Sequence, residues 1–140
     1  MKVFYAAIFS LIYLVTSLDN GVGLTPLTPP IGWNSWNKFD CSINEKLIMS
    51  TIDAIFSSGL AKAGYTYVNI DDCWQKKTRD ENGKVQPNPN FFPNGLKVLA
   101  DYAHEKGLKF GLYSDAGYAT CCNLPFSLGY EDIDAKTYEE

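Results

Sequence analysis

The chain has 140 residues, of which 46% are hydrophobic and 20% are charged. This composition is typical of a folded globular protein and excludes a disordered or coiled-coil chain. Twelve Lys and Arg against sixteen Asp and Glu give a net charge of −4. The acidic balance argues against a nucleic-acid partner, because a protein that binds phosphates needs a basic surface.

The first 17 residues predict a secretory signal peptide. Lys2 precedes an apolar run from Val3 to Val15, and small side chains follow at Thr16 and Ser17. The run is shorter than the ~20 residues that cross a bilayer, although a retained membrane anchor remains the alternative. We therefore expect a mature chain of residues 18–140 without a membrane segment, in which disulfides can form.

The rest of the sequence predicts strands that alternate with helices. Apolar spacings of three and four indicate helices, and runs of β-branched and aromatic residues indicate strands. In chain order we expect a strand at 31–36, a helix at 44–63, a strand at 65–70, a helix from an N-cap at Asn94 to about 106, a strand at 108–114 and the first turns of a helix at 131–140. This order predicts an α/β fold with parallel strands.

The number of elements is too small for a closed barrel. A barrel of this type needs eight strand–helix units and ~250 residues, whereas three strands and about two and a half helices are expected here. We interpret the chain as the N-terminal part of a longer protein. No glycine-rich phosphate fingerprint follows any strand, which disfavours dinucleotide binding.

Polar and aromatic residues gather where the predicted strands end, at Trp36, at Asp71 and Asp72, and at Tyr113. Ligands of parallel α/β folds bind at this edge. A carboxylate can accept hydrogen bonds from two neighbouring sugar hydroxyls, and an indole can pack on the apolar face of a sugar ring. The alternatives are a solvated or helix-capping acidic pair, a metal site at the two aspartates, a core tryptophan and a half-buried tyrosine.

The single histidine and the four cysteines exclude some chemistries. His104 has no second histidine four residues later, and the chain has no G-x-S-x-G serine, so we interpret His104 as a cation at a helix C-terminus. The cysteines lack paired zinc-knuckle spacing, which favours disulfides. Cys41 and Cys73 follow adjacent strands at the same edge, so we predict that they bridge. Of the neighbours Cys121 and Cys122, one is expected to pair beyond residue 140.

Several long motifs occur in order along the chain. They include Thr28-Pro-Pro-Ile-Gly-Trp-Asn-Ser-Trp36, Tyr67-Val-Asn-Ile-Asp-Asp-Cys-Trp74 and Gly111-Leu-Tyr-Ser-Asp-Ala-Gly117, with Thr120-Cys121 after them. Through these motifs the chain resembles the N-terminal third of eukaryotic α-galactosidases of glycoside hydrolase family 27 (melibiase type). The resemblance implies a (β/α)8 TIM barrel, of which only the first three strands and about two and a half helices are present. It also implies a retaining enzyme that releases terminal α-linked galactose.

The resemblance assigns roles to individual residues. Trp36 corresponds to the indole beneath the galactose, Asp71 and Asp72 to the pair that holds its hydroxyls, and Tyr113 to a residue that lines the pocket. Cys121 corresponds to a cysteine whose disulfide borders the sugar. In the family, the second cysteine of that disulfide lies in a Tyr-Leu-Lys-Tyr-Asp-Asn-Cys motif, which does not occur in residues 1–140. That motif also carries the family's nucleophile, and the acid/base aspartate comes later still. No catalytic residue, metal or cofactor is therefore expected here, and these 140 residues alone should be inactive.

The chain departs from the family in one loop. Where family members usually read Pro-Gly-Ser-Leu-Gly-His-Glu, this chain has Pro125-Phe-Ser-Leu-Gly-Tyr-Glu131, and the shorter turn before it adds Cys122. The alternatives to an α-galactosidase are an α-N-acetylgalactosaminidase of the same family and a non-catalytic galactose-binding remnant. The expected partner is a terminal α-galactosyl carbohydrate, and the expected destination is extracellular, lysosomal or vacuolar. The sequence does not indicate an oligomeric state.

Overall fold

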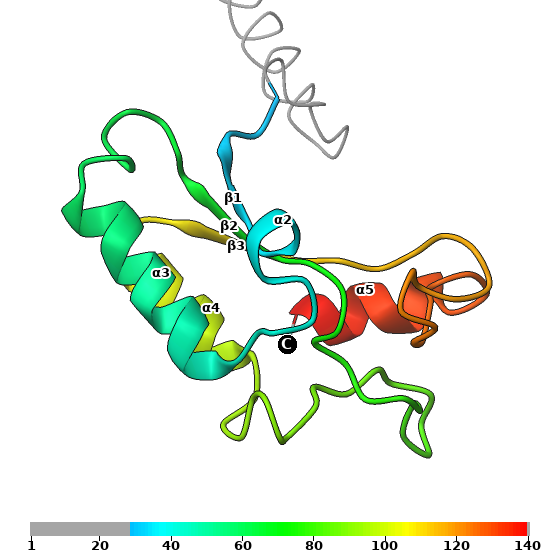
Figure 1. The fold of residues 1–140 in the computed structure, drawn as a ribbon. Coiled ribbons are helices and arrows are strands. Elements are labelled where there is room, and N and C mark those ends of the chain that lie inside the picture. Colours follow the sequence, from blue (N-terminus) through cyan, green and yellow to red (C-terminus); the bar gives the residue numbers. More distant parts are fainter. Residues whose placement is uncertain (1–28, 140) are drawn as a thin grey trace, which may run out of the picture.

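The computed structural model describes residues 29–139, so the signal peptide expected at residues 1–17 lies outside the described residues. The described chain is an α/β structure around a three-stranded parallel sheet in the order β1-β2-β3 (Figure 1). The strands are β1 (Gly32–Asn34), β2 (Tyr67–Ile70) and β3 (Lys109–Leu112). The predicted α/β class and the parallel pairing of the strands are confirmed.

Four helices connect or follow these strands in the described part of the chain. They are α2 (Trp36–Phe39), α3 (Glu45–Ser57), α4 (Lys97–Glu105) and α5 (Glu131–Glu139). Helices α3 and α4 lie side by side, and α4 also packs against β3 (Figure 1). The last residues of α5 line a cavity together with α4, on the same face of the sheet. No helix within residues 29–139 combines the length and the apolar character needed to cross a membrane.

The two faces of the sheet differ in chemistry. Because side chains alternate along a strand, the register puts Trp33, Val68 and Phe110 on one face. That face packs on the helices, and the core it shares with them includes Ile48, Ile52, Ile70, Leu99 and Ala103. The other face, which we call the polar face, carries Asn34, Asn69 and Gly111 in register. The hydrophobic effect thus fixes which way each strand turns its side chains.

Two predicted helices begin or end elsewhere in the structure. The N-cap at Asn44 is present, since its side chain accepts a hydrogen bond from the Leu47 amide, but the helix ends at Ser57 rather than at residue 63. Gly59 follows with a φ of +87°, a conformation that stops a helix. The next helix begins at Lys97, and Asn94 is not its N-cap, because the Asn94 side chain donates instead to the Glu45 carboxylate.

All three strands are shorter than predicted, and the one expected at 65–70 begins at Tyr67. The strand expected at 31–36 ends at Asn34, because the Asn34 side-chain oxygen accepts a hydrogen bond from the Trp36 amide at 2.8 Å and turns the chain into α2. The strand expected at 108–114 is confined to Lys109–Leu112. The acidic helix expected from Glu131 is confirmed.

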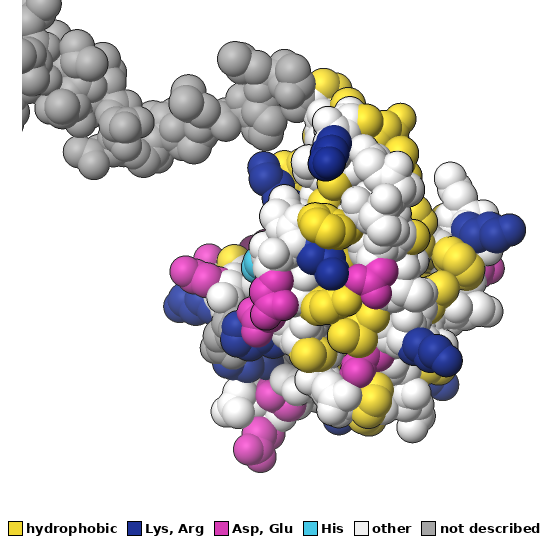
Figure 2. All heavy atoms as spheres, turned by 90° about the vertical axis from the view of Figure 1, so that its left-hand side faces the viewer, with side chains coloured by type: hydrophobic (Ala, Val, Ile, Leu, Met, Phe, Trp, Pro, Cys, Tyr) yellow, Lys and Arg dark blue, Asp and Glu magenta, His cyan; other side chains and the backbone are white. Residues whose placement is uncertain are grey.

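The outer surface of the α3–α4 layer mixes hydrophobic and charged side chains (Figure 2). Lys106 illustrates how they combine, since its ammonium lies 5.2 Å from the ring centre of Phe56 and 4.6 Å from that of Tyr102. The same ammonium forms an ion pair with Asp53 at 3.1 Å. These contacts partly cover apolar surface between the two helices.

Neighbouring positions on α4 provide a test of the core. Leu99 is fully buried, whereas Val98 is 37% exposed. We expect Leu99→Ala to lower the free energy of unfolding by about 2–5 kcal/mol, because it removes buried methyl groups and leaves a cavity. Val98→Ala, the matched control, should change it by only about 0.5 kcal/mol. Denaturant unfolding of both variants measures the difference, and equal effects would contradict the assigned helix face.

Candidate functional site

A small hollow of about 210 Å³ lies where the three strands end. It is lined by Asn34, Asn69, Ile70, Asp71, Gly111, Leu112 and Tyr113. We call the segments after β1, β2 and β3 the first loop (35–44), the second loop (71–96) and the third loop (113–130). The hollow opens at the predicted edge of the sheet, on the polar face, and it brings Asp71 and Tyr113 together.

Asp71 is held in a fixed position by its neighbours. Its amide donates to the hydroxyl of the buried Ser35 at 3.0 Å. One carboxylate oxygen accepts from the Asn34 side-chain amide at 2.8 Å, and the other accepts from the Asp72 amide at 2.8 Å. Each oxygen keeps capacity to accept a further hydrogen bond from a ligand. Asn34 was not predicted as a site residue, and its only sequence signal was its place between two tryptophans.

Asp72 has different surroundings from Asp71. It is only 1% exposed, and its two oxygens accept hydrogen bonds from the Cys73 amide at 2.8 Å and the Cys122 amide at 2.9 Å. The Asp72 carboxylate thereby joins the second loop to the third. The two neighbouring carboxylates are therefore not equivalent, and a direct role of Asp72 in holding a ligand stays a prediction.

Tyr113 contributes a hydroxyl to the same edge. Its carbonyl accepts a hydrogen bond from the Trp74 indole at 2.9 Å, and its hydroxyl donates to Asp115 at 3.4 Å. The hydroxyl also lies 3.8 Å from the sulfur of the exposed Cys121. Burial, followed by the nearby Cys121 thiol, raises the pKa of Tyr113 to about 12. At neutral pH this hydroxyl is therefore protonated and can donate a hydrogen bond.

Trp36 is the first residue of α2 and does not line the hollow itself. Its backbone is linked to the hollow through Asn34, which bonds both the Trp36 amide and the Asp71 carboxylate. The indole is half-buried. Trp33, by contrast, packs against the core on the helix-covered face.

The predicted disulfide between Cys41 and Cys73 is confirmed, with the two Cα atoms 5.3 Å apart. It ties the first loop to the second loop directly after Asp72. Within residues 29–139, the one group of three potential metal ligands consists of Cys41, Cys73 and Cys122. Two of these sulfurs are bonded to each other, so the oxidised chain presents a single thiol there. Asp71 and Asp72 belong to no such group in this part of the chain.

A charged network that was not predicted from the sequence fixes the third loop. Arg79 donates to both oxygens of the buried Asp134, one at 2.7 Å, and to the Phe126 carbonyl at 2.6 Å. Asp134 also accepts from the Ser127 hydroxyl, and the Arg79 guanidinium lies 4.0 Å from the ring centre of Tyr130. Arg79 and Asp134 are 55 residues apart, and neither residue signals its partner in the sequence.

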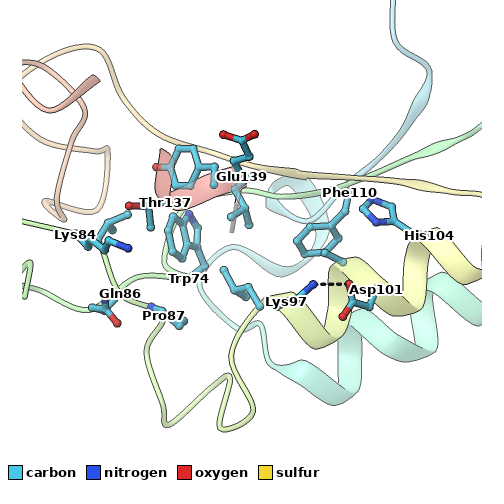
Figure 3. A pocket seen from close by; sticks show the side chains of 15 residues that line it. Trp74, Lys84, Gln86, Pro87, Lys97, Asp101, His104, Phe110, Thr137 and Glu139 are labelled. Atoms are coloured by element: carbon cyan, nitrogen blue, oxygen red, sulfur yellow. Dashed lines mark hydrogen bonds and ion pairs between the residues drawn. The ribbon is translucent and has the colours of Figure 1, made fainter. Parts of the chain in front are cut away.

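A larger cavity, of about 600 Å³, lies on the helix-covered side of the sheet (Figure 3). It lies between α4 and the end of α5, and Trp74, Phe110 and His104 are among its lining residues. The Lys97–Asp101 ion pair borders it. His104 lies in the last turn of α4, as its interpretation as a helix C-terminal cation predicted. This cavity is separate from the carboxylate edge, because Phe110 belongs to the face opposite the polar face.

Comparison with known proteins identifies the family. The sequence model of a family described as Alpha galactosidase A (Melibiase_2) matches residues 28–140. An α-galactosidase of Coffea arabica is 57% identical over 122 residues, which make up 86% of this chain and 32% of that protein. α-Galactosidase I from Mortierella vinacea has a similar structure, with a TM-score of 0.79 and 50% identity over 86% of this chain and 30% of that one. An α-galactosidase from Saccharomyces cerevisiae, solved with raffinose, gives a TM-score of 0.77 at 42% identity over 80% of this chain and 25% of that one.

The parallel sheet and its polar carboxyl edge define an α/β protein of the kind that binds ligands where its strands end. The chain belongs to the α-galactosidase (melibiase) family of glycoside hydrolases, as its motifs implied. It spans about a third of the length of its curated relatives, 32% of the coffee protein and 29% of that from Cyamopsis tetragonoloba.

The Arg79–Asp134 pair predicts a dependence of stability on pH. Burial alone would raise the Asp134 pKa, but hydrogen bonds from Arg79 and Ser127 outweigh it and hold the pKa below its usual 3.8. The pair therefore stabilises the fold above about pH 4, and this stability is lost as the pH falls through the folded-state pKa. Asp134→Asn should cost about 3 kcal/mol at neutral pH, because it leaves Arg79 without its counter-charge, and should flatten this acid dependence.

Urea unfolding at a series of pH values measures both effects. Asp132→Asn, on the same helix but exposed, is the matched control and should keep the acid dependence of the wild type. A loss of stability below pH 4 that is the same with and without the Asp134 carboxylate would contradict the assignment.

Proposed function

We propose that this chain is the N-terminal part of the (β/α)8 catalytic barrel of a secreted α-galactosidase. The proposal includes a signal peptide at residues 1–17 and a barrel segment at residues 18–140. Its support is the family match over residues 28–140 together with parallel β1, β2 and β3 in sequential order, as a barrel requires. A secretory route, with an extracellular, lysosomal or vacuolar destination, fits a chain that carries a disulfide.

The proposed substrate is a carbohydrate with a terminal α-linked galactose. The observation that carries this proposal is the fixed Asp71 carboxylate at the strand edge, in a hollow that Tyr113 also lines. A carboxylate with spare acceptor capacity suits neighbouring sugar hydroxyls, and the phenol oxygen, whose proton goes to Asp115, can accept from a further hydroxyl. Trp36, directly after Asn34, is the residue we assign to the sugar face, because an indole packs well on sugar C–H groups. Cys121 borders the Tyr113 hydroxyl and completes the proposed rim.

Within this proposal the described carboxylates bind the sugar and do not attack it. A retaining glycosidase needs two carboxyl groups about 5–5.5 Å apart on either side of the scissile bond. Asp72 is 1% exposed and both of its oxygens accept from backbone amides, so only Asp71 reaches the hollow and the two carboxylates do not face each other across a bound sugar. We assign the nucleophile and the acid/base of the double displacement to later parts of the family barrel.

A chimera tests the binding role. Residues 29–139 replace the matching segment of the coffee α-galactosidase, and the product is assayed with p-nitrophenyl α-galactoside. We expect the chimera to hydrolyse this substrate. Asp71→Asn in the chimera should lower kcat/KM by about 10–100-fold, because a hydrogen bond to a charged group contributes about 1.5–3 kcal/mol. The control Asp101→Asn removes an exposed carboxylate of α4 and should leave kcat/KM unchanged. A folded but inactive chimera, or full activity after Asp71→Asn, would refute the assignment.

A second prediction concerns the 140-residue polypeptide assayed alone. It should release no nitrophenol from p-nitrophenyl α-galactoside above the uncatalysed rate, because its carboxylates hold the sugar without a nucleophile beside the anomeric carbon. The chimera serves as the positive control. Turnover that disappears with Asp71→Asn would show that the chemistry lies in this segment after all.

A further inference from the structure

Cys122 lies against the disulfide, although neither the bridge nor the proposed sugar site requires a third cysteine there. Its sulfur is 3.3 Å from the sulfur of Cys41. The sulfurs of Cys41, Cys73 and Cys122 all lie within 4.8 Å of one another. Cys122 is a free thiol and is half-buried, whereas its neighbour Cys121 is exposed. A thiol is therefore in contact with one sulfur of an existing disulfide.

The fold holds Cys122 in this position from both sides. The buried Asp72 carboxylate accepts from the Cys122 amide with one oxygen and from the Cys73 amide with the other. On the other side, the buried Thr120 closes a tight turn, because its hydroxyl accepts from the Leu124 amide and its carbonyl from the Asn123 amide. The contact between the sulfurs is thus fixed by hydrogen bonds from backbone amides on both sides of Cys122.

We propose that Cys41, Cys73 and Cys122 form a thiol–disulfide exchange centre. The Cys122 thiol loses its proton to water, and the resulting thiolate attacks the sulfur of Cys41. A Cys41–Cys122 bond forms as the Cys41–Cys73 bond breaks, and the electron pair of the broken bond leaves on Cys73, which then takes up a proton. One disulfide and one thiol are present before and after, so the step needs neither an oxidant nor a reductant.

The exchange moves a covalent link from one loop to another. In the structure Cys41 ties the first loop to the second loop, and after exchange it ties the first loop to the third. Cys73 has a φ of +75°, a conformation rarely adopted by residues with a side chain, and it directly follows Asp72. Release of its sulfur removes a covalent restraint beside the two carboxylates. The inference does not depend on the proposed enzymatic activity, since it concerns bonds within this chain alone.

The surroundings of Cys122 set the pH at which exchange is fast. Burial, followed by the Asp72 and Asp40 carboxylates, raises the pKa of the Cys122 thiol, and the Cys121 thiol also faces it. Since the thiolate is the attacking species, its fraction and the exchange rate should rise about tenfold per pH unit below that pKa. Exchange is therefore slow at neutral pH and accelerates in mild alkali.

Tryptic mapping distinguishes the two disulfides. Cleavage after lysine puts Cys41 in peptide 39–46, Cys73 in peptide 63–76 and Cys122 in peptide 110–136. The folded Cys121→Ser chain is held at about pH 7 and about pH 9, quenched with acid, alkylated and digested. We expect peptide 39–46 linked to 110–136, together with alkylated Cys73, in a share that grows at least tenfold faster at the higher pH. The wild-type chain is mapped in parallel, with fragment ions that separate Cys121 from Cys122.

The converse variant is the matched control. Cys122→Ser keeps the exposed Cys121 one position away and should retain only the link between peptides 39–46 and 63–76. A Cys41–Cys73 link that stays complete at both pH values in the Cys121→Ser and wild-type chains would overturn the proposal. So would exchange through Cys121 as fast as through Cys122, because the position of the thiol would then have no effect.

Discussion

The arrangement of this edge depends on the hydrogen bonds that the buried Asp72 carboxylate accepts. A carboxylate that is 1% exposed is stable only when hydrogen-bond donors replace its lost water. Both donors are backbone amides, one from the second loop at Cys73 and one from the third loop at Cys122. The Cys41–Cys73 disulfide adds the first loop to the same point. One charge and one covalent bond thereby join the three segments that follow the three strands.

Alternation along β2 explains why two adjacent aspartates have different surroundings. Successive side chains of an extended segment point to opposite faces, so Asp71 meets the polar face while Asp72 turns into the loop packing. Asp71 is engaged by Asn34 and stays accessible at the hollow, whereas both oxygens of Asp72 are occupied within the protein. A pair that reads as one acidic motif therefore divides into a group that can contact a ligand and a group that organises the loops.

The departures of this chain from the usual family motif gather around Arg79. The Phe126 carbonyl accepts from its guanidinium, and the Tyr130 ring lies 4.0 Å from it. Both residues belong to the segment in which the sequence is expected to depart from the family motif. Arg79 also holds Asp134 at the start of α5, so the same cation orients the third loop and the helix that follows it. Cys122 adds a thiol to this loop at the place where it meets the disulfide.

The sequence by itself determined the order of strands and helices, the Cys41–Cys73 bridge and the edge at which the polar residues meet, because these follow from local periodicity and from the geometry of parallel strands. It could not determine where every helix begins, since Asn94 reads as an N-cap, whereas in the structure its side chain donates to Glu45, 49 residues away. The Arg79–Asp134 pair and the contact of Cys122 with Cys41 likewise join residues 55 and 81 positions apart. Only the tertiary structure decided them, because a side chain with several possible partners binds the one that folding brings within reach.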